Sequence, residues 1–206
     1  MTEKERKREL RRLLTARSAA MDPALRRQCG EAACLRLLQS GLWEKASGVL
    51  LTASTPQELD TAPLLRAALL QDKPLFLPKC RGKSMDFFGL RSLSELRPGA
   101  FGLLEPPDER PLEPMPGLLA VVPALACDKR GIRLGKGGGY YDRFLSGFEG
   151  ATACLVLEQM LFDALPREPH DAAVRYLFTQ QRTIDTADVR QLRPVPPARR
   201  GRACPV

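Results

Sequence analysis

The chain of 206 residues contains a single histidine, which restricts the chemistry that it can perform. No Ser-His-Asp set accompanies it, so nucleophilic catalysis of that kind is not expected. No apolar run approaches the roughly 20 residues that a membrane helix requires. The six cysteines form no CxxC pair, and several lie in apolar runs, as is typical of reduced, buried thiols. Together with an N-terminal segment that is charged rather than apolar, these absences predict a soluble cytoplasmic protein without a membrane partner.

The overall composition is that of one globular domain. Hydrophobic residues make up 44% and charged residues 27% of the chain, a balance that excludes a largely disordered protein. Its length suffices for about three layers of secondary structure around a core. There is no internal repeat, and the 18 prolines indicate many turns and extended connections.

A formal net charge of +8 favours an anionic partner, but charge alone does not identify one. Much of the excess lies in Lys4–Arg12 and Ala198–Arg202, and each segment is equally compatible with a solvated surface. Neither carries the interleaved aromatic residues on which single-strand binders stack bases. We therefore expect small-molecule ligands rather than nucleic acid, and a monomer, with a homodimer as the alternative.

The hydrophobic pattern alternates between helical and strand periods, which predicts an α/β fold. Helices are expected over residues 3–17, 23–41, 61–71 and 140–145, and strands over 47–53, 74–78, 85–90, 118–127, 152–158 and 174–179. We expect a single three-layer α/β/α domain over residues 1–190, with a mostly parallel, Rossmann-like central sheet. The Pro- and Arg-rich tail, residues 191–206, is expected to be disordered.

A glycine-rich stretch, GIRLGKGGGYYDRFL, runs from Gly131 to Leu145 between a buried strand and a short helix. A parallel sheet commonly binds phosphate at such a place, because free N–H groups and the helix dipole converge there. The stretch is not a Walker A loop, since Lys136 is followed by Gly137 rather than by Ser or Thr. Nor is it a dinucleotide fingerprint, since Tyr140 stands where the third glycine is required.

The alternative interpretation of the glycines is a tight turn without a ligand. That interpretation leaves Arg133, Lys136 and Asp142 unexplained. Two cations suit an anion, and a carboxylate suits the metal ion that accompanies a phosphate. The combination favours a phosphate site.

The stretch from Val121 to Leu145 resembles the signature of the 5-formyltetrahydrofolate cyclo-ligases, also called methenyltetrahydrofolate synthetases. In that signature a strand ending in Asp is followed by Arg-Leu-Gly and then by Gly-Gly-Gly-Tyr-Tyr-Asp. Further landmarks follow in the family's order over residues 4–180: KRELR (7–11), ELDT (58–61), LPK (77–79), MDF (85–87), FGLLEP (101–106) and LPREPHD (165–171).

The resemblance implies conversion of 5-formyltetrahydrofolate to 5,10-methenyltetrahydrofolate with hydrolysis of ATP and a requirement for Mg²⁺. The formyl oxygen is phosphorylated, a neighbouring folate nitrogen closes the ring, and phosphate leaves. Such a reaction needs positioning and charge neutralisation more than a protein nucleophile. A weakened relative that binds folate or nucleotide for buffering or regulation is the alternative.

The resemblance also assigns residues to ATP, and the catalytic ones among them are Arg133, Lys136 and Tyr140. Lys7 and Arg11, one helical turn apart, are expected at the phosphates, although a solvated basic helix is the alternative. The full set expected at ATP is Lys7, Arg8, Arg11, Arg133, Leu134, Gly135, Lys136, Gly137, Gly138, Gly139, Tyr140 and Tyr141.

Folate and magnesium are assigned to a smaller set. The folate site is expected to include Glu58, Met85, Lys136 and Tyr140, with Phe87 beside Met85 and core packing as the alternative for both. Two carboxylates are expected to hold Mg²⁺. They are Asp142 and Asp171; taken alone, each is better explained as a helix-surface or turn aspartate, and only the resemblance assigns it to the metal.

Three positions depart from the family pattern or invite another interpretation. Arg175 stands where an aspartate is usual; if that aspartate orders the metal's surroundings, Mg²⁺ binding weakens, and if it only anchors a strand, activity survives. Ala124 replaces a glycine, for which a local backbone adjustment is expected. His170 is expected to be a neighbour of Asp171 rather than a base, and Cys127 to serve packing.

Overall fold

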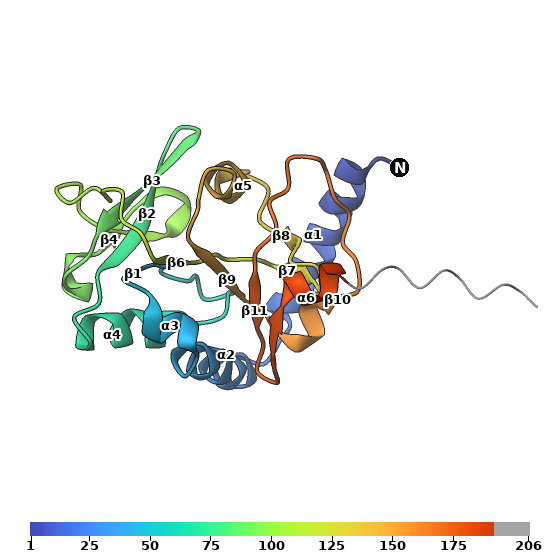
Figure 1. Cartoon of the computed structure of the whole chain (residues 1–206). Helices are drawn as coiled ribbons and strands as arrows, with labels where there is room; N and C mark the ends of the chain where they lie inside the picture. Colours follow the sequence, from blue (N-terminus) through green and yellow to red (C-terminus); the bar gives the residue numbers. More distant parts are fainter. Residues whose placement is uncertain (192–206) are drawn as a thin grey trace, which may run out of the picture.

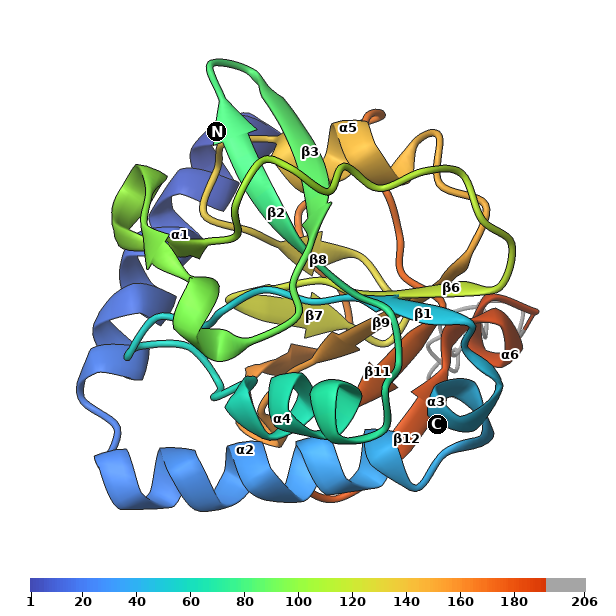
Figure 2. The same ribbon diagram turned by 90° about the vertical axis from the view of Figure 1, so that its left-hand side faces the viewer.

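The computed structural model describes residues 1–191. The tail predicted over residues 191–206 therefore lies outside the described residues, apart from Gln191. Figure 1 shows a central sheet with helices on both of its faces, and Figure 2 shows the same layers from the side. None of the helices within residues 1–191 combines the length and the apolar character that crossing a bilayer requires.

Helices cover the two faces of the sheet unequally. Three of them pack on one face: α2 (Pro23–Leu38), α3 (Gly41–Lys45) and α4 (Ala62–Leu70). The other face carries α1 (Glu3–Ala19) and α5 (Tyr140–Leu145). The start of α1 is fixed by a capping box, in which the side chains of Thr2 and Glu5 each accept a hydrogen bond from the other's backbone N–H. Asp22 caps α2 and Pro23 occupies its first turn, as the sequence predicts.

The central sheet has seven strands in the order β12-β11-β9-β6-β1-β2-β3. The five inner strands are parallel to one another, and β3 and β12 are antiparallel edges. The strands are β1 (Gly48–Leu50), β2 (Leu75–Arg81), β3 (Ser84–Gly89), β6 (Leu118–Val121), β9 (Ala151–Leu155), β11 (Tyr176–Phe178) and β12 (Thr183–Asp185).

The strand order reverses at β1. The chain first adds β2 on one side of β1 and later adds β6 on the other side. In a doubly wound sheet the loops that leave two such strands diverge to opposite faces, which opens a crevice at their carboxyl ends. A ligand site is therefore expected just beyond Leu50 and Val121.

Smaller elements complete the fold. A second sheet joins β7 (Ala126–Asp128), β8 (Arg133–Leu134) and β10 (Leu161–Phe162). A two-stranded ribbon joins β4 (Arg97–Pro98) to β5 (Leu104–Glu105). The remaining elements are the 3-10 helices η1 (Leu93–Glu95), η2 (Ala100–Gly102) and η3 (Glu158–Met160), and the helix α6 (Thr186–Gln191).

Two hydrophobic clusters lie on the two faces of the sheet, and the alternation of side chains along each strand divides residues between them. On β6, Leu119 and Val121 pack with α2 and α4, whereas Leu118 and Ala120 pack with α1 and α5. Because these strands are buried on both faces, their sequences are continuous apolar runs.

The predicted fold class is confirmed, and one predicted strand is wrong. Residues 118–127 form two strands rather than one, because β6 ends at Val121 and β7 begins at Ala126. Pro123 lacks the N–H that a central strand would donate, so the chain leaves the main sheet there and enters the second sheet. The connection over residues 98–116, whose prolines predict irregular structure, contains η2 and β5.

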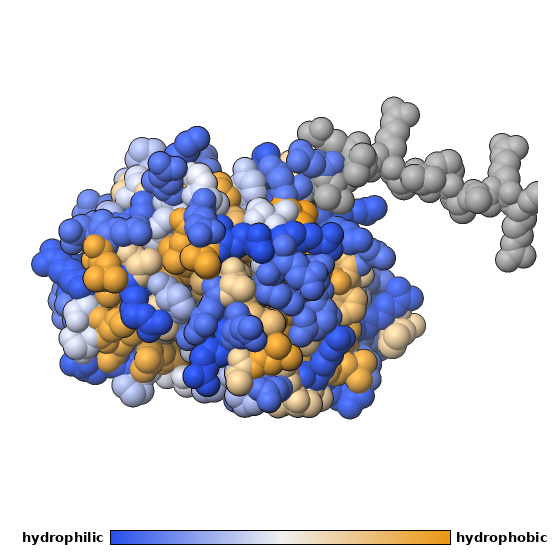
Figure 3. Space-filling model, turned by 90° about the horizontal axis from the view of Figure 1, so that it is seen from below, coloured by the Kyte–Doolittle hydropathy of each residue, from blue (hydrophilic) through white to orange (hydrophobic). Residues whose placement is uncertain are grey.

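The face formed by α2 to α4 carries separate apolar groups among hydrophilic residues (Figure 3). Leu25 and Leu35 of α2 and Leu70 of α4 are exposed there. Scattered exposed leucines of this kind are ordinary on a soluble surface and mark no site.

Candidate active site

The glycine loop, residues 135–139, joins β8 to α5 on the face of the sheet that carries α1. Two of its glycines adopt positive φ angles, 104° at Gly137 and 67° at Gly139. A Cβ at Gly137 would lie 3.5 Å from the guanidinium of Arg11, and one at Gly139 would lie 2.9 Å from Arg143. The positive φ angles favour glycine at both positions; the contact at Gly137 is an ordinary one, and at Gly139 the flexible end of Arg143 would have to shift.

Helix α1 contacts the loop through Arg11, whose Nε donates to the carbonyl oxygen of Gly135 at 2.8 Å. Arg8, on the same helix, is exposed. Lys7, which is expected with Arg11 at the phosphates, is buried and donates to an acidic cluster. The basic helix is therefore partly built into the site rather than wholly solvated.

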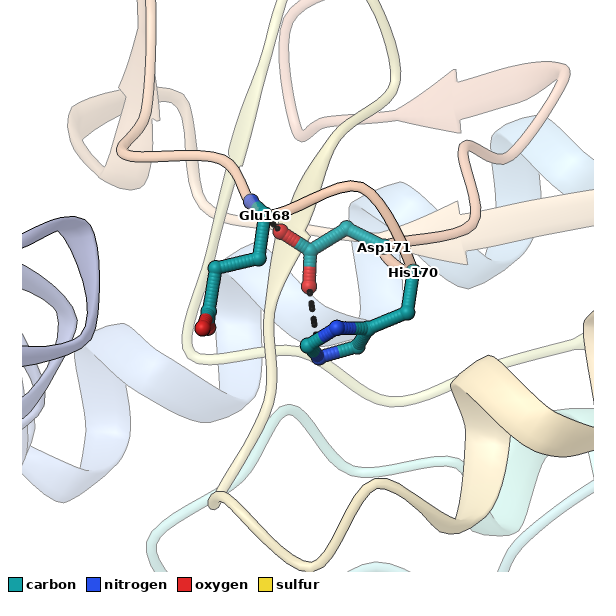
Figure 4. A group of neighbouring side chains, drawn as sticks. All are labelled: Glu168, His170 and Asp171. Carbon is teal, nitrogen blue, oxygen red and sulfur yellow. Dashed lines mark hydrogen bonds and ion pairs between the residues drawn. The ribbon is translucent and has the colours of Figure 1, made fainter.

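The acidic cluster holds Lys7 from two sides. Its ammonium donates to Asp171 Oδ1 at 2.6 Å and to Glu168 Oε2 at 3.0 Å. Asp171 also accepts the backbone N–H of Glu168 at 2.7 Å. His170 is exposed, and its Nε2 lies 3.9 Å from Asp171 (Figure 4), which agrees with its expected role as a neighbour. One ligand atom each of Glu168, His170 and Asp171 lies within 4.8 Å of the other two, so the three side chains form one group (Figure 4).

A second ion pair lies next to the first. Arg133, whose side chain is only 3% exposed, donates to Asp142 at 2.9 Å. Asp142 also accepts the backbone N–H of Ala172 at 3.3 Å, so the start of α5 adjoins the segment that carries Asp171. The Nε of Arg133 is buried without a hydrogen-bond partner among residues 1–191. An unsatisfied buried donor of this kind is costly and suits an incoming anion.

The carboxylates fit the oxygen chemistry that Mg²⁺ prefers. Oδ1 of Asp142 accepts hydrogen bonds from Arg133 and Ala172, whereas Oδ2 forms no hydrogen bond or ion pair within residues 1–191. Asp171 is different, because both of its oxygens already accept hydrogen bonds from Lys7. Asp142 can therefore coordinate a cation directly. Asp171 can do so only after the ammonium group of Lys7 has moved away from its carboxylate.

The glycine loop meets the segment after β1 through an ion pair. Lys136 Nζ lies 2.9 Å from Glu58 Oε1, and Oε2 of Glu58 accepts from the backbone and hydroxyl of Thr55 at 2.8 and 2.9 Å. Glu58 lines a cavity of about 30 Å³ at the ends of β1 and β6, with Thr52, Pro123 and Ala124. This cavity lies at the expected crevice, but it has room for about one water molecule, so a ring system enters only if the lining moves.

The hydroxyl groups of the two tyrosines after the loop form hydrogen bonds with different neighbours. The Tyr140 hydroxyl donates to the carbonyl of Gly82 at 2.6 Å. The Tyr141 hydroxyl lies 2.7 Å from the hydroxyl of Thr52, and Arg133 stacks on its ring. Burial raises the pKa of Tyr141 above its ordinary value, against the hydrogen bond with Thr52, which lowers it. Tyr141 therefore stays protonated and links α5 to β1.

Two predicted folate residues lie on β3. Met85 is half-buried near the tip of the β2–β3 hairpin. Phe87 is buried, and its ring centre lies 4.8 Å from that of Phe144 on α5. Both side chains pack with the same hydrophobic cluster, Phe87 within it and half-buried Met85 against its edge, so core packing is compatible with both.

Arg175, the departure from the family pattern, is part of a strand pair. Its guanidinium donates to both oxygens of Asp185 on β12, at 2.6 and 2.8 Å. Its backbone N–H donates to Thr152 at 2.8 Å. These contacts anchor β11 against its neighbours. Cys127 is fully buried beside Cys154, as its expected packing role requires.

Sequence reasoning missed four residues that shape this site. Asp128 stands inside the signature stretch Val121–Leu145 and Glu168 inside the landmark LPREPHD, so the sequence offered a signal for both. Asp128 is buried and accepts the backbone N–H groups of Arg130, Ile132 and Leu165. Nothing in the local pattern indicated Thr52 or Arg143.

A roomier cavity lies elsewhere, between β2 and the β4–β5 ribbon, with a volume of about 390 Å³. Its charged lining is balanced, since Lys79, Arg97 and Arg110 face Glu95, Glu105 and Glu109. No residue of the glycine loop lines it, so it is separate from the phosphate site.

Comparison with known proteins agrees with this geometry. Residues 3–180 match the 5-formyltetrahydrofolate cyclo-ligase family. The chain is 36% identical over 190 residues to 5-formyltetrahydrofolate cyclo-ligase of Mycolicibacterium smegmatis. This alignment covers 86% of the present chain and 95% of the relative. The solved structure of Aquifex aeolicus 5,10-methenyltetrahydrofolate synthetase matches with a TM-score of 0.78 and 29% identity, over 97% of this chain and 96% of the other.

A more distant solved structure shares the fold. The 5,10-methenyltetrahydrofolate synthetase of Mycoplasma pneumoniae matches with a TM-score of 0.67 and 15% identity, over 84% of this chain and 98% of the other. The family match spans α1, the segment after β1, the glycine loop and the Asp171 segment, and these are the parts that meet around Lys7, Lys136 and Asp142. The chain belongs to the 5-formyltetrahydrofolate cyclo-ligase family.

Proposed function

We propose that this cyclo-ligase converts 5-formyltetrahydrofolate to 5,10-methenyltetrahydrofolate by ATP-dependent activation of the formyl oxygen. The contact between Lys136 and Glu58 carries the proposal, because it joins the glycine loop to the crevice at the ends of β1 and β6. A phosphate on the loop and a folate in the crevice are then neighbours. Glu58 offers a carboxylate, which suits the amino and ring N–H groups of a pterin.

The proposed chemistry has two steps. The terminal phosphoryl group of ATP passes to the formyl oxygen, and ADP leaves. The neighbouring folate nitrogen then attacks the formyl carbon, loses its proton, and expels the oxygen as phosphate. A C–N bond forms and a C–O bond breaks, so no oxidant or protein nucleophile is required.

The chain supplies positioning and positive charge for this reaction. Lys136 is exposed on the loop and can follow the transferring phosphoryl group away from Glu58. Arg133 has a buried, unpartnered Nε next to the loop, and Arg11 fixes the loop backbone. Lys7 is held beside them by Asp171 and Glu168. Tyr140 is a candidate folate contact, since it lies between the loop and the β2–β3 hairpin.

Magnesium completes the proposal. Asp142 is the ligand with an uncommitted oxygen, and Asp171 becomes a second ligand if Lys7 transfers to the phosphates. A bound Mg²⁺ ion supplies neutralisation of phosphate charge. The reduced, unpaired state of the five described cysteines suits a cytoplasmic enzyme, and we propose that it acts there as a monomer.

The decisive experiment follows the absorbance of methenyltetrahydrofolate in the presence of ATP, Mg²⁺ and 5-formyltetrahydrofolate. Product formation that requires all three is the expected result. Absence of product from a folded sample that binds ATP contradicts the proposal. A matched reaction without ATP measures the spontaneous background.

A further inference from the structure

The tip of the β2–β3 hairpin is tied to the start of α5 by two hydrogen bonds. Tyr140 donates its hydroxyl to the carbonyl of Gly82 at 2.6 Å, and Arg143 Nη2 donates to the carbonyl of Lys83 at 2.9 Å. Figures 1 and 2 both show the hairpin beside α5. Two side chains of α5 thus donate hydrogen bonds to the carbonyl oxygens of two consecutive residues in the turn of the β2–β3 hairpin.

Arg143 makes further contacts on the loop side. The same Nη2 lies 3.2 Å from the carbonyl of Gly138, and the guanidinium stacks 5.1 Å from the centre of the Tyr140 ring. One side chain therefore touches the glycine loop, Tyr140 and the hairpin tip. The planar, multidentate guanidinium is suited to joining three groups in this way, whereas an ammonium is not.

The base of the hairpin tip is held by the pairing of Arg81 with Ser84 and by an ion pair of Arg81 with Asp108 at 2.8 Å, whereas Gly82 and Lys83 are held through their carbonyls by α5. Residues 81–84 are all exposed, and β3 is an edge strand of the sheet. A two-stranded segment without a packed face is marginally stable, so its tip opens readily unless it is tied down. The first residue beyond this tip is Met85, which faces the loop side half-buried.

We propose that Arg143 is a positioning residue whose hydrogen bonds hold the β2–β3 hairpin next to the glycine loop. In this arrangement Met85 and Tyr140 are placed to contact the folate. The inference rests on the proposed function and deepens it. Arg143 contacts no reacting group in this assignment and acts through the hairpin and the Tyr140 ring. Its loss is expected to affect folate binding more than ATP binding, since the hairpin contributes no residue to the set expected at ATP.

Limited trypsin digestion tests, without any enzyme assay, whether Arg143 holds the hairpin tip in place. Arg81 and Lys83 provide two cleavage sites on that tip. Arg143→Ala is expected to accelerate cleavage at these sites about tenfold, as expected when opening of a local segment becomes easier. Arg91→Ala is the matched control, because Arg91 is exposed just beyond the hairpin and its side chain forms no ion pair within residues 1–191. Equal cleavage of Arg143→Ala and the parent overturns the proposal.

Kinetics test the positioning role. Arg143→Ala is expected to raise KM for 5-formyltetrahydrofolate by about tenfold while changing KM for ATP and kcat much less. Millimolar guanidinium is expected to lower that KM in Arg143→Ala but not in the parent, and Arg143→Lys is expected to fall between them. Equal effects on both KM values, or no rescue, indicate a merely structural residue and overturn the proposal.

Failure of the proposed function gives a different result. In that case the parent makes no methenyl product, whatever the digestion shows. Faster cleavage of Arg143→Ala then establishes a structural tie only, and the positioning role is overturned together with the function.

Discussion

Lys136 of the glycine loop and Glu58 of the segment after β1 form an ion pair with an N–O distance of 2.9 Å. The Lys136 side chain is 58% exposed and that of Glu58 is 15% exposed, so the pair lies between the solvent-exposed loop and the cavity that Glu58 lines. One partner belongs to the proposed phosphate site and the other to the proposed folate site. Substrate binding therefore requires that the pair separates or turns toward the ligands.

Separate replacements of the two partners are expected to affect different kinetic constants. Glu58→Gln removes the carboxylate, and we expect KM for 5-formyltetrahydrofolate to rise about tenfold or more with KM for ATP little changed. Lys136→Met is expected to lower kcat, because a cation at the transferring phosphoryl group is lost. Urea unfolding serves as the control, since an ion pair whose lysine is largely solvated contributes about 1 kcal/mol or less. A large loss of folding stability in either variant would contradict this assignment.

Asp142→Asn tests the proposed metal ligand. We expect activity to fall about 100-fold and the Mg²⁺ concentration for half-maximal rate to rise, because one anionic ligand is lost. The measurement is the cyclisation rate over a range of Mg²⁺ concentrations. Asp163→Asn is the matched control, since Asp163 is an exposed carboxylate that pairs with Lys129. An unchanged Mg²⁺ requirement in an active Asp142→Asn protein would refute the role.

Arg175→Asp tests the alternative that this protein is a weakened relative. The structure leads us to expect no gain in activity, because Arg175 serves Asp185 and β12. The replacement sets two carboxylates against each other, so the unfolding midpoint is expected to fall slightly. Arg182→Ala, which breaks another surface pair, with Glu158, is the comparison. A strong increase in cyclisation rate on introducing Asp would instead support the weakened-relative hypothesis.

Cysteine reactivity follows burial in this fold. Burial, reinforced by Asp60 and Glu31, raises the pKa of Cys34 to about 12. A shift of three units from 9 leaves roughly 1,000-fold less thiolate at pH 8 than in an ordinary thiol. The hydrogen bond with Cys154 and burial raise the pKa of Cys127 as well.

We therefore expect iodoacetamide at pH 8 to leave Cys34 and Cys127 unlabelled in the native protein and to label both in urea. Half-buried Cys29 is the internal comparison and is expected to react first. At pH 9 the Cys34 thiol is still almost fully protonated, because its pKa is about 12. Raising the pH from 8 to 9 is therefore expected to leave native labelling of Cys34 slow. Site-resolved mass spectrometry measures the result, and rapid native labelling of Cys34 would contradict the described burial.

Local sequence signals were sufficient for most helices and inner strands. Asp22 and Pro23 define the start of α2, and Tyr140–Leu145 is a helix as predicted. The strand over residues 118–127 was placed wrongly, since apolar character alone does not show that Pro123 ends β6. The edge strand β12 was not predicted, because its residues Thr183–Asp185 lack a long apolar run.

The site was predictable only where a motif carries its own chemistry. The glycine loop and Asp142 stand within one contiguous stretch, so composition and spacing indicated a phosphate site with a carboxylate beside it. The partners of Lys7 were not predictable in this way. Helical spacing placed Lys7 beside Arg11 on one face, but not the burial of its ammonium between Glu168 and Asp171.

The sequence by itself determined the α/β class, the glycine loop and the family, because these depend on periodicity and on contiguous residue types. The tertiary structure decided which distant residues meet: Lys7 with Asp171, Lys136 with Glu58, and Arg143 with Lys83 in the turn between β2 and β3. Those contacts follow from strand order and from the reversal at β1, which bring loops from different parts of the chain to one edge of the sheet. No local pattern specifies that arrangement, since it arises only when the whole sheet has assembled.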